Sequence, residues 1–288
     1  MEKTLQEFRE MLVVSGKMPR TVDGYERAVR MLGEFHGKDP ATLTEADIRR
    51  YFVHAREVRK WKHYTIKIAL TAIKFYYSHV CGWEWKIWDI AKPPKVKPEI
   101  VVLSREEIAA VIGKVRAPHM KVFLRLVASC GLRLGEALRV ETSDIDAKAG
   151  RLMIRDGKGG KDRYVPVSQE LVAALRAHWL THRNPKLLFP SGGRGRSVKQ
   201  RSTSRKHYSI NAPGVAFRKA LEAAGVNRKV SIHNLRHSYA TNLLEEGINL
   251  RALAHYMGHG DLNTTMQYLH LTPSAQRSAR AIIEKYSL

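Results

Sequence analysis

Cysteine is scarce in this 288-residue chain, which contains only two. Cys81 and Cys130 each lie among apolar or aromatic neighbours and fall on opposite sides of an expected domain boundary, so we expect two thiols rather than a disulfide. Long apolar runs are also lacking. No stretch of eighteen apolar residues occurs, and charged residues interrupt the N-terminal segment where a signal peptide would be continuously hydrophobic. These absences predict a cytoplasmic protein that does not enter a membrane.

Acidic residues are few, with 27 Asp and Glu against 50 Lys and Arg, a formal net charge of +23. The excess is uneven: residues 1–91 carry 16 basic and 12 acidic side chains, whereas residues 92–288 carry 34 and 15. A surplus of this size attracts a polyanion and releases its counterions on binding. The composition therefore predicts nucleic acid as the partner, although a solvated basic surface that aids solubility is the simpler alternative.

Helical periodicity and a change of composition predict two domains. Apolar residues recur at helical spacing in residues 1–90, and Thr44 with Asp47 resembles a capping box. Residues 91–102 begin with three prolines and three lysines among nine residues, which favours an extended interdomain linker. Residues 103–288 form the expected second domain, whose first helix follows a second capping box at Ser104 and Glu107.

A short β-meander is expected inside the second domain, which is otherwise mainly helical. Two strand-like segments, Arg151–Arg155 and Arg163–Val167, flank a glycine-rich run that carries Lys158 near its tip. This run is not a nucleotide-binding P-loop, because the spacing differs and no Ser or Thr follows Lys161. The predicted fold class is mainly α with a small antiparallel β-meander.

A basic, glycine- and serine-rich segment covers Ser191 to Tyr208. It holds six Lys and Arg residues and no acid. By composition it is a mobile loop, and beside a duplex it would become ordered on phosphates. The two interpretations are compatible, and the sequence leaves both open.

The second domain also contains an ordered set of cationic, imidazole and phenol side chains. They are Arg133, Lys158, His233, Arg236, His259 and Tyr268. Phosphodiester cleavage passes through a pentavalent transition state with negative charge on its non-bridging oxygens, and planar guanidinium groups match those oxygens bidentately. With a tyrosine as nucleophile, such a set can cleave a phosphodiester without a metal or another cofactor.

The spacing of these residues resembles that of the tyrosine recombinases, the phage-integrase and Xer-like site-specific recombinases. His233 and Arg236 form the family's His-x-x-Arg motif, and Tyr268 follows the His259 of a Gly-His pair by nine residues. The resemblance implies an N-terminal helical, SAM-like core-binding domain and an α+β catalytic domain. It also implies cleavage and rejoining of DNA strands through a 3′-phosphotyrosine and a Holliday junction, without ATP.

The resemblance assigns a role to each residue of the set. Arg133 and Arg236 would hold the scissile phosphate, and Glu136, on the same turn as Arg133, would orient its guanidinium. Lys158 would protonate the leaving 5′ oxygen, although Lys161 is close enough to leave that choice open. His233 would exchange a proton with the nucleophile or the phosphate. His259 would donate to a non-bridging oxygen.

The family likeness also implies the partners. These are double-stranded DNA with specific core sites, further copies of the chain in a tetramer, and an accessory protein. The location that the likeness implies is the nucleoid. Residues 273–288 have apolar residues at helical spacing. The terminal helix predicted there would either pack on its own domain or dock into a neighbouring protomer.

Three other interpretations remain possible from the sequence. His233 with His237, and His255 with His259, have the spacing of metal-binding pairs, but neither pair has the HExxH carboxylate. We therefore assign His237 and His255 to ordinary packing or hydrogen bonding. A relaxing activity like that of type IB topoisomerases would use similar chemistry within one duplex. A DNA-binding regulator or accessory protein would keep the fold without using the chemistry.

Overall fold

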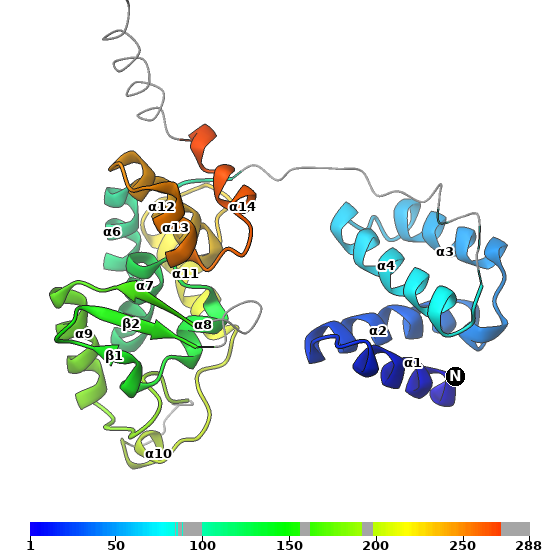
Figure 1. The fold of residues 1–288 in the computed structure, drawn as a ribbon, viewed down its shortest axis with the longest axis horizontal. Helices are drawn as coiled ribbons and strands as arrows, with labels where there is room; N and C mark the ends of the chain where they lie inside the picture. Colours follow the sequence, from blue (N-terminus) through cyan, green and yellow to red (C-terminus); the bar gives the residue numbers. More distant parts are fainter. Residues whose placement is uncertain (84, 86–87, 89–99, 156–161, 192–197, 272–288) are drawn as a thin grey trace, which may run out of the picture. The chain divides into compact units, whose positions relative to one another are not determined.

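The computed structural model describes residues 1–271 except residues 84, 86–87, 89–99, 156–161 and 192–197. The chain divides into two compact units, Met1–Pro98 and Glu99–Leu288, which are described separately (Figure 1). Most of the expected linker, Lys158 and the expected helix 273–288 lie outside the described residues.

The described part of the first unit contains four α-helices around one apolar core. They are α1 (Glu2–Val14), α2 (Pro19–His36), α3 (Glu45–Glu57) and α4 (His63–His79), with a 3-10 turn at Pro40–Thr42. Leu5, Phe8 and Leu12 of α1 are buried, as their helical spacing predicts. The capping box at Thr44 and Asp47 begins α3. Hydrogen bonds from Thr44, first from its backbone, lower the pKa of Asp47 to about 2.

The described part of the second unit is mainly helical. Its α-helices are α6 (Arg105–Gly113), α7 (Pro118–Cys130), α8 (Leu134–Arg139), α9 (Gln169–Leu180), α10 (Val198–Ser202), α11 (Ala212–Ala223), α12 (Ile232–Glu245), α13 (Leu250–Met257) and α14 (Asn263–Met266), with 3-10 turns at Thr142–Asp144 and Leu269–Leu271. None of the described helices is long and apolar enough to cross a membrane. Helix α12 begins at Ile232, because Ser231 and Asn234 form a capping box there.

The predicted meander is a three-stranded antiparallel sheet in the order β1 (Ile145–Asp146), β2 (Arg151–Ile154), β3 (Arg163–Pro166). Leu152 pairs with Val165, and Ile154 pairs with Arg163. All four of these side chains are buried, so Arg163 lies on the core face of the sheet. The fold class predicted from the sequence is thus confirmed.

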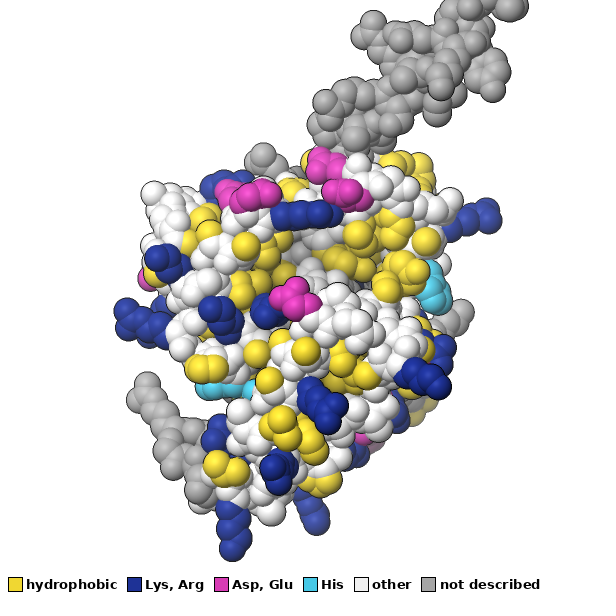
Figure 2. Space-filling model, turned by 90° about the vertical axis from the view of Figure 1, so that its left-hand side faces the viewer, with side chains coloured by type: hydrophobic (Ala, Val, Ile, Leu, Met, Phe, Trp, Pro, Cys, Tyr) yellow, Lys and Arg dark blue, Asp and Glu magenta, His cyan; other side chains and the backbone are white. Residues whose placement is uncertain are grey.

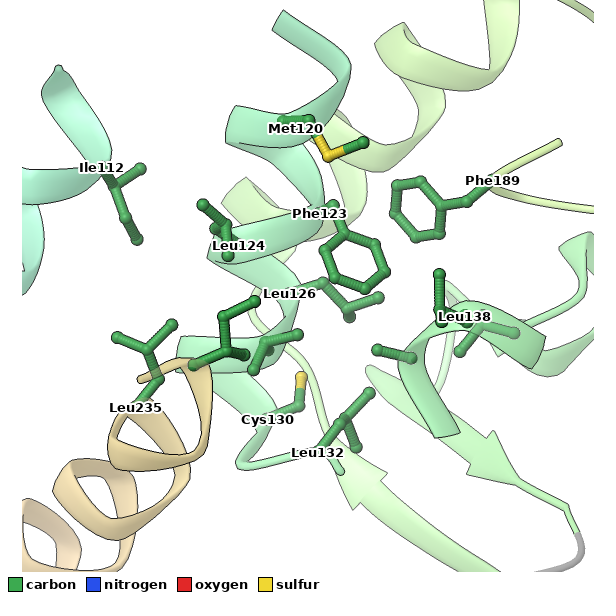
Figure 3. Packing of buried hydrophobic residues seen from close by; sticks show 14 of the residues in the cluster. Ile112, Met120, Phe123, Leu124, Leu126, Cys130, Leu132, Leu138, Phe189 and Leu235 are labelled. Atoms are coloured by element: carbon green, nitrogen blue, oxygen red, sulfur yellow. The ribbon is translucent and has the colours of Figure 1, made fainter. Parts of the chain in front are cut away.

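Helix α7 runs through the core of the second unit and packs against α12, α9 and α11 (Figure 1). Figure 3 shows its apolar side chains meeting those of the surrounding elements, with Phe123 beside Phe189 at a ring-centroid distance of 5.0 Å. The helix ends at Gly131, which has φ +59°. A Cβ there would lie 2.3 Å from the Tyr239 ring, so only glycine fits this turn. The turn places Arg133 directly after the core helix.

One buried histidine of this core predicts a loss of stability in acid. His178 on α9 is buried and stacks on Phe189 at 5.1 Å. Burial, followed by the neighbouring His182, lowers the pKa of His178 to about 4. In the unfolded chain a histidine has a pKa near 6.5. The unfolded state therefore binds more protons than the folded state between these values, and stability falls as the pH falls.

We expect His178 to cost about 3 kcal/mol of unfolding free energy between pH 7 and pH 4. Urea unfolding at pH 7, 6, 5 and 4, compared between the wild type and His178→Leu, measures this contribution. The variant should show the shallower dependence on pH. Equal slopes for the two proteins would contradict the assignment.

Candidate active site

Arg133 occupies the turn between α7 and α8, as the N-cap residue of α8. Its backbone N–H donates to Oε2 of Glu136 at 2.9 Å, and its Nη1 donates to Oε1 at 2.7 Å. Its Nη2 donates to the carbonyl of Gly258 at 3.1 Å. The side chain is 27% exposed. The predicted orientation of Arg133 by Glu136 is therefore present, and the guanidinium stays within reach of a ligand.

Arg236, on the first turns of α12, is almost fully enclosed. Its Nη1 donates to the carbonyl of Gly131 at 2.7 Å, and its Nη2 donates to the carbonyl of Met257 and to Nε2 of His259, the latter at 3.1 Å. Burial, followed by the charge of Arg133, lowers the pKa of Arg236 to about 10. The site therefore holds two guanidinium groups close enough to repel each other, which favours an anion between them.

Glu136 is the acidic centre of the site. Its side chain is 3% exposed and accepts hydrogen bonds from Nη1 and Nη2 of Arg163 at 3.1 and 2.8 Å. Nη1 of Arg236 lies 4.0 Å from the same carboxylate. Burial alone would raise the pKa of Glu136, but the hydrogen bonds and charge of Arg163, with those of Arg133, lower it to about 2. One buried carboxylate thus orients three arginines.

Arg163 is the contributor that the sequence analysis missed. It is buried on β3, and its Nε donates to the carbonyl of Tyr256 at 2.9 Å. A Cβ at Gly258, whose φ is +60°, would lie 2.8 Å from the Arg163 guanidinium carbon. The sequence pattern that could have revealed Arg163 is the alternation of side chains along a strand, because Arg163 shares a face with the apolar Val165. An arginine at a core-facing position needs a buried partner.

His259 follows Gly258, the left-handed C-cap of α13. Its Nδ1 lies 2.7 Å from Oγ1 of Thr265, and its Nε2 accepts from Arg236. Because arginine only donates, these contacts fit a neutral ring that carries its proton on Nδ1. His259 is thereby fixed from both sides.

Tyr268 lies just after α14, at the start of the Leu269–Leu271 turn, and is 1% exposed. Its ring is nearly parallel to that of His259, with centroids 6.5 Å apart. Its hydroxyl is 2.9 Å from Nδ1 of His237. Burial raises the pKa of Tyr268, an effect that the charges of Arg236 and Arg133 partly offset. The hydroxyl is therefore protonated at neutral pH.

His233, in the first turn of α12, keeps part of its surface exposed. Its ring meets the ring of His237 edge-on at 4.5 Å. Partial desolvation, followed by the charges of Arg236 and Arg133, lowers the pKa of His233. An exposed, neutral imidazole therefore lies within the electrostatic influence of the two arginines, where it can accept a proton.

Five of the six residues singled out from the sequence lie in the second unit around the two arginines and the tyrosine, whereas Lys158 lies outside the described residues. His237, assigned from the sequence to packing or hydrogen bonding, bonds to the tyrosine hydroxyl itself. In the described part of the chain, no group of three or more His, Cys, Asp or Glu side chains could hold a metal ion. The cluster combines two guanidinium groups that can bind an anion, an imidazole that can accept a proton and a tyrosine hydroxyl.

Comparison with known proteins agrees with this arrangement. Residues 102–275 match the model of the Phage integrase family, and residues 4–87 match the Phage integrase, N-terminal SAM-like domain. A putative integrase/recombinase of Sinorhizobium fredii, y4qK, is 30% identical over 92% of this chain and 83% of its own length. Tyrosine recombinase XerA of Thermococcus kodakarensis is 29% identical over 98% of this chain and 97% of its own.

Solved structures give the same result. A crystal structure of XerA recombinase is 28% identical, with a TM-score of 0.53, and 97% of each chain is covered. A lambda integrase dimer bound to a core site shares the fold, with a TM-score of 0.72 at 17% identity over 93% of this chain and 76% of the other. The family match covers more than half of the chain and includes every residue of the cluster. The chain belongs to the phage integrase family and is a tyrosine recombinase.

Proposed function

We propose that the chain is a site-specific DNA recombinase that cleaves and rejoins strands through a 3′-phosphotyrosine at Tyr268 and a Holliday junction. The observation that carries the proposal is that one residue lies between the proposed nucleophile, Tyr268, and the proposed phosphate-binding arginine, Arg236. His259 contacts Arg236 through Nε2 and lies parallel to the ring of Tyr268. Family membership supports the reaction class.

The scissile phosphate would bind between Arg133 and Arg236. Arg133 is held along one edge by Glu136 and remains partly exposed, and Arg236 is held by backbone carbonyls. Arginines fixed in this way lose little freedom when they bind a phosphate, and they stabilise the charge of the transition state where it develops. When phosphate binds, the ring proton of His259 would lie on Nε2, with the Thr265 hydroxyl donating to Nδ1, and Nε2 would donate to a non-bridging phosphate oxygen in place of its contact with Arg236.

The reaction conserves the energy of the broken bond. The Tyr268 oxygen attacks phosphorus, its proton passes to His233, and the bond to the 5′ oxygen breaks. Lys158 gives that oxygen a proton, so the broken strand ends in a free 5′ hydroxyl on one side of the break and in a 3′-phosphotyrosine on the other. Attack by a 5′ hydroxyl of the partner strand reverses these steps. Neither ATP nor a metal takes part.

The charge of the chain supports DNA as the substrate. Figure 2 shows many Lys and Arg side chains spread over one face of the molecule, with fewer Asp and Glu. Solved structures of the same fold include the lambda integrase dimer on a core site and a lambda integrase tetramer on a Holliday junction. We propose that this chain likewise binds core-site DNA and assembles as a tetramer there, within the cytoplasm at the nucleoid.

We propose a role for each domain and for one further partner protein. In this proposal residues 1–90 bind the core site, residues 91–102 link the domains, and residues 273–288 dock into the next protomer. An accessory protein would set the order of strand exchange. Truncation before residue 273 tests the docking, which it should abolish together with self-association on DNA.

The proposal is tested with duplexes that carry a nick beside the cleavage point, drawn from the DNA that flanks the gene. The protein is incubated with them in EDTA without ATP, and a protein–DNA adduct that survives denaturation is sought. We expect an adduct whose peptide map places the nucleotide on Tyr268. Binding without any adduct across such a library would instead favour a DNA-binding regulator.

A further inference from the structure

A histidine outside the set singled out from the sequence, His237, forms a hydrogen bond with the proposed nucleophile. Nδ1 of His237 is 2.9 Å from the Tyr268 hydroxyl, and the two ring centroids are 5.6 Å apart. His237 is one residue after Arg236 on α12, so the helix that presents the phosphate-binding arginine also holds the tyrosine. The hydrogen bond forms with either tautomer of the ring, because the hydroxyl can donate or accept.

The hydroxyl held in this way is closed to a substrate. Tyr268 is 1% exposed and belongs to an apolar cluster that includes Leu253 and Met257. A phosphate group of DNA cannot reach a hydroxyl oxygen that water does not reach. The Tyr268 side chain must therefore leave this position before it attacks phosphorus. The hydrogen bond to His237 opposes that departure, since both groups would lose a partner.

The neutral state of both side chains stabilises the closed position. Burial, followed by His233 and Arg236, lowers the pKa of His237 to about 4, and burial raises the pKa of Tyr268. The proton therefore remains on the tyrosine, and the imidazole remains neutral. This pairing gives a hydrogen bond between two neutral groups and leaves the tyrosine a poor nucleophile, which suits a resting state.

We propose that His237 is a positioning residue that holds the hydroxyl of Tyr268 in a closed resting position, from which the tyrosine must be released to cleave DNA. The expected effect on cleavage rests on the proposed function, whereas the hydrogen bond between His237 and Tyr268 does not. The exposed His233 remains the proton acceptor after release.

The test uses the full chain with His237→Ala and His237→Asn, in which the amide can replace Nδ1. His255→Ala is the matched control, because His255 lies exposed on α13. Cleavage of a nicked duplex is followed in a single turnover with saturating protein. Losing one hydrogen bond that favours the closed position should raise the cleavage rate of His237→Ala roughly five- to tenfold. His237→Asn should restore most of the wild-type rate, and His255→Ala should match the wild type.

A second measurement needs no activity. Fluorotyrosine incorporated at Tyr268 gives a ¹⁹F resonance whose shift between H₂O and D₂O reports solvent contact. We expect a small isotope shift in the wild type, a large one with His237→Ala and an intermediate one with His237→Asn. These spectra separate the two proposals: if no DNA is cleaved, the proposed function fails while the resting contact is still tested.

Two results would overturn the inference. Slower cleavage by His237→Ala, with its thermal stability retained, would mean that His237 assists the chemical step instead of holding the tyrosine back. An isotope shift that is the same in all the proteins would mean that the hydrogen bond does not keep the hydroxyl closed.

Discussion

Tyr268→Phe is expected to abolish the covalent adduct and to reduce strand cleavage by at least about 10⁴-fold, the loss typical of removing an enzyme's nucleophile. The substitution removes one oxygen and keeps the ring that packs against Met257 and faces His259. DNA affinity should not change, because the hydroxyl is buried and the arginines are untouched. Adduct formation on denaturing gels and duplex affinity by fluorescence anisotropy measure the two quantities on the same protein.

Tyr256→Phe is the matched control, since Tyr256 is the other tyrosine near the motif. It contributes its backbone carbonyl to Arg163, which the substitution preserves. This variant should form the adduct at the wild-type rate. If the adduct persists in Tyr268→Phe and disappears in Tyr256→Phe, Tyr256 is the nucleophile and the proposed chemistry is wrong.

Glu136→Gln is expected to cost about 3–5 kcal/mol of unfolding free energy, because it leaves buried arginines without their counter-charge. Arg163 and Arg236 are 4% and 2% exposed and share this carboxylate, so neither can turn to solvent. Cleavage should fall even at a temperature where the variant is folded, because Arg133 loses its orienting partner as well. Urea unfolding and single-turnover cleavage measure the two effects.

Glu170→Gln removes a carboxylate that also pairs with an arginine, Arg125, but at a side chain that is 83% exposed. A surface ion pair contributes roughly 0–1 kcal/mol, so this control should unfold almost like the wild type. If Glu136→Gln were equally mild, the buried carboxylate would not be what holds the arginines. The difference between the two variants isolates burial as the cause.

The order of short motifs was enough to predict the fold class and to single out five residues that lie together in the structure, because each motif is local. The capping boxes at Thr44 and Ser104 likewise depend on residues three apart. The pairing of Arg163 with Glu136 joins a strand to a helix 27 residues away, and no local pattern specifies such a partner. The contact of His237 with Tyr268 depends on how α12 and the turn after α14 pack.

Three of the groups that hold Arg133 and Arg236 in place are main-chain carbonyls, those of Gly131, Met257 and Gly258. Every amino acid brings a carbonyl, so the acceptor at position 257 does not depend on the identity of the side chain, although the Met257 side chain is itself buried in the core. The acceptor does depend on the length of α13. One inserted residue would advance its end by about 1.5 Å and rotate it by about 100°, which carries two acceptors away from the guanidinium groups. Natural selection should therefore remove insertions and deletions in α13 sooner than substitutions that keep its length.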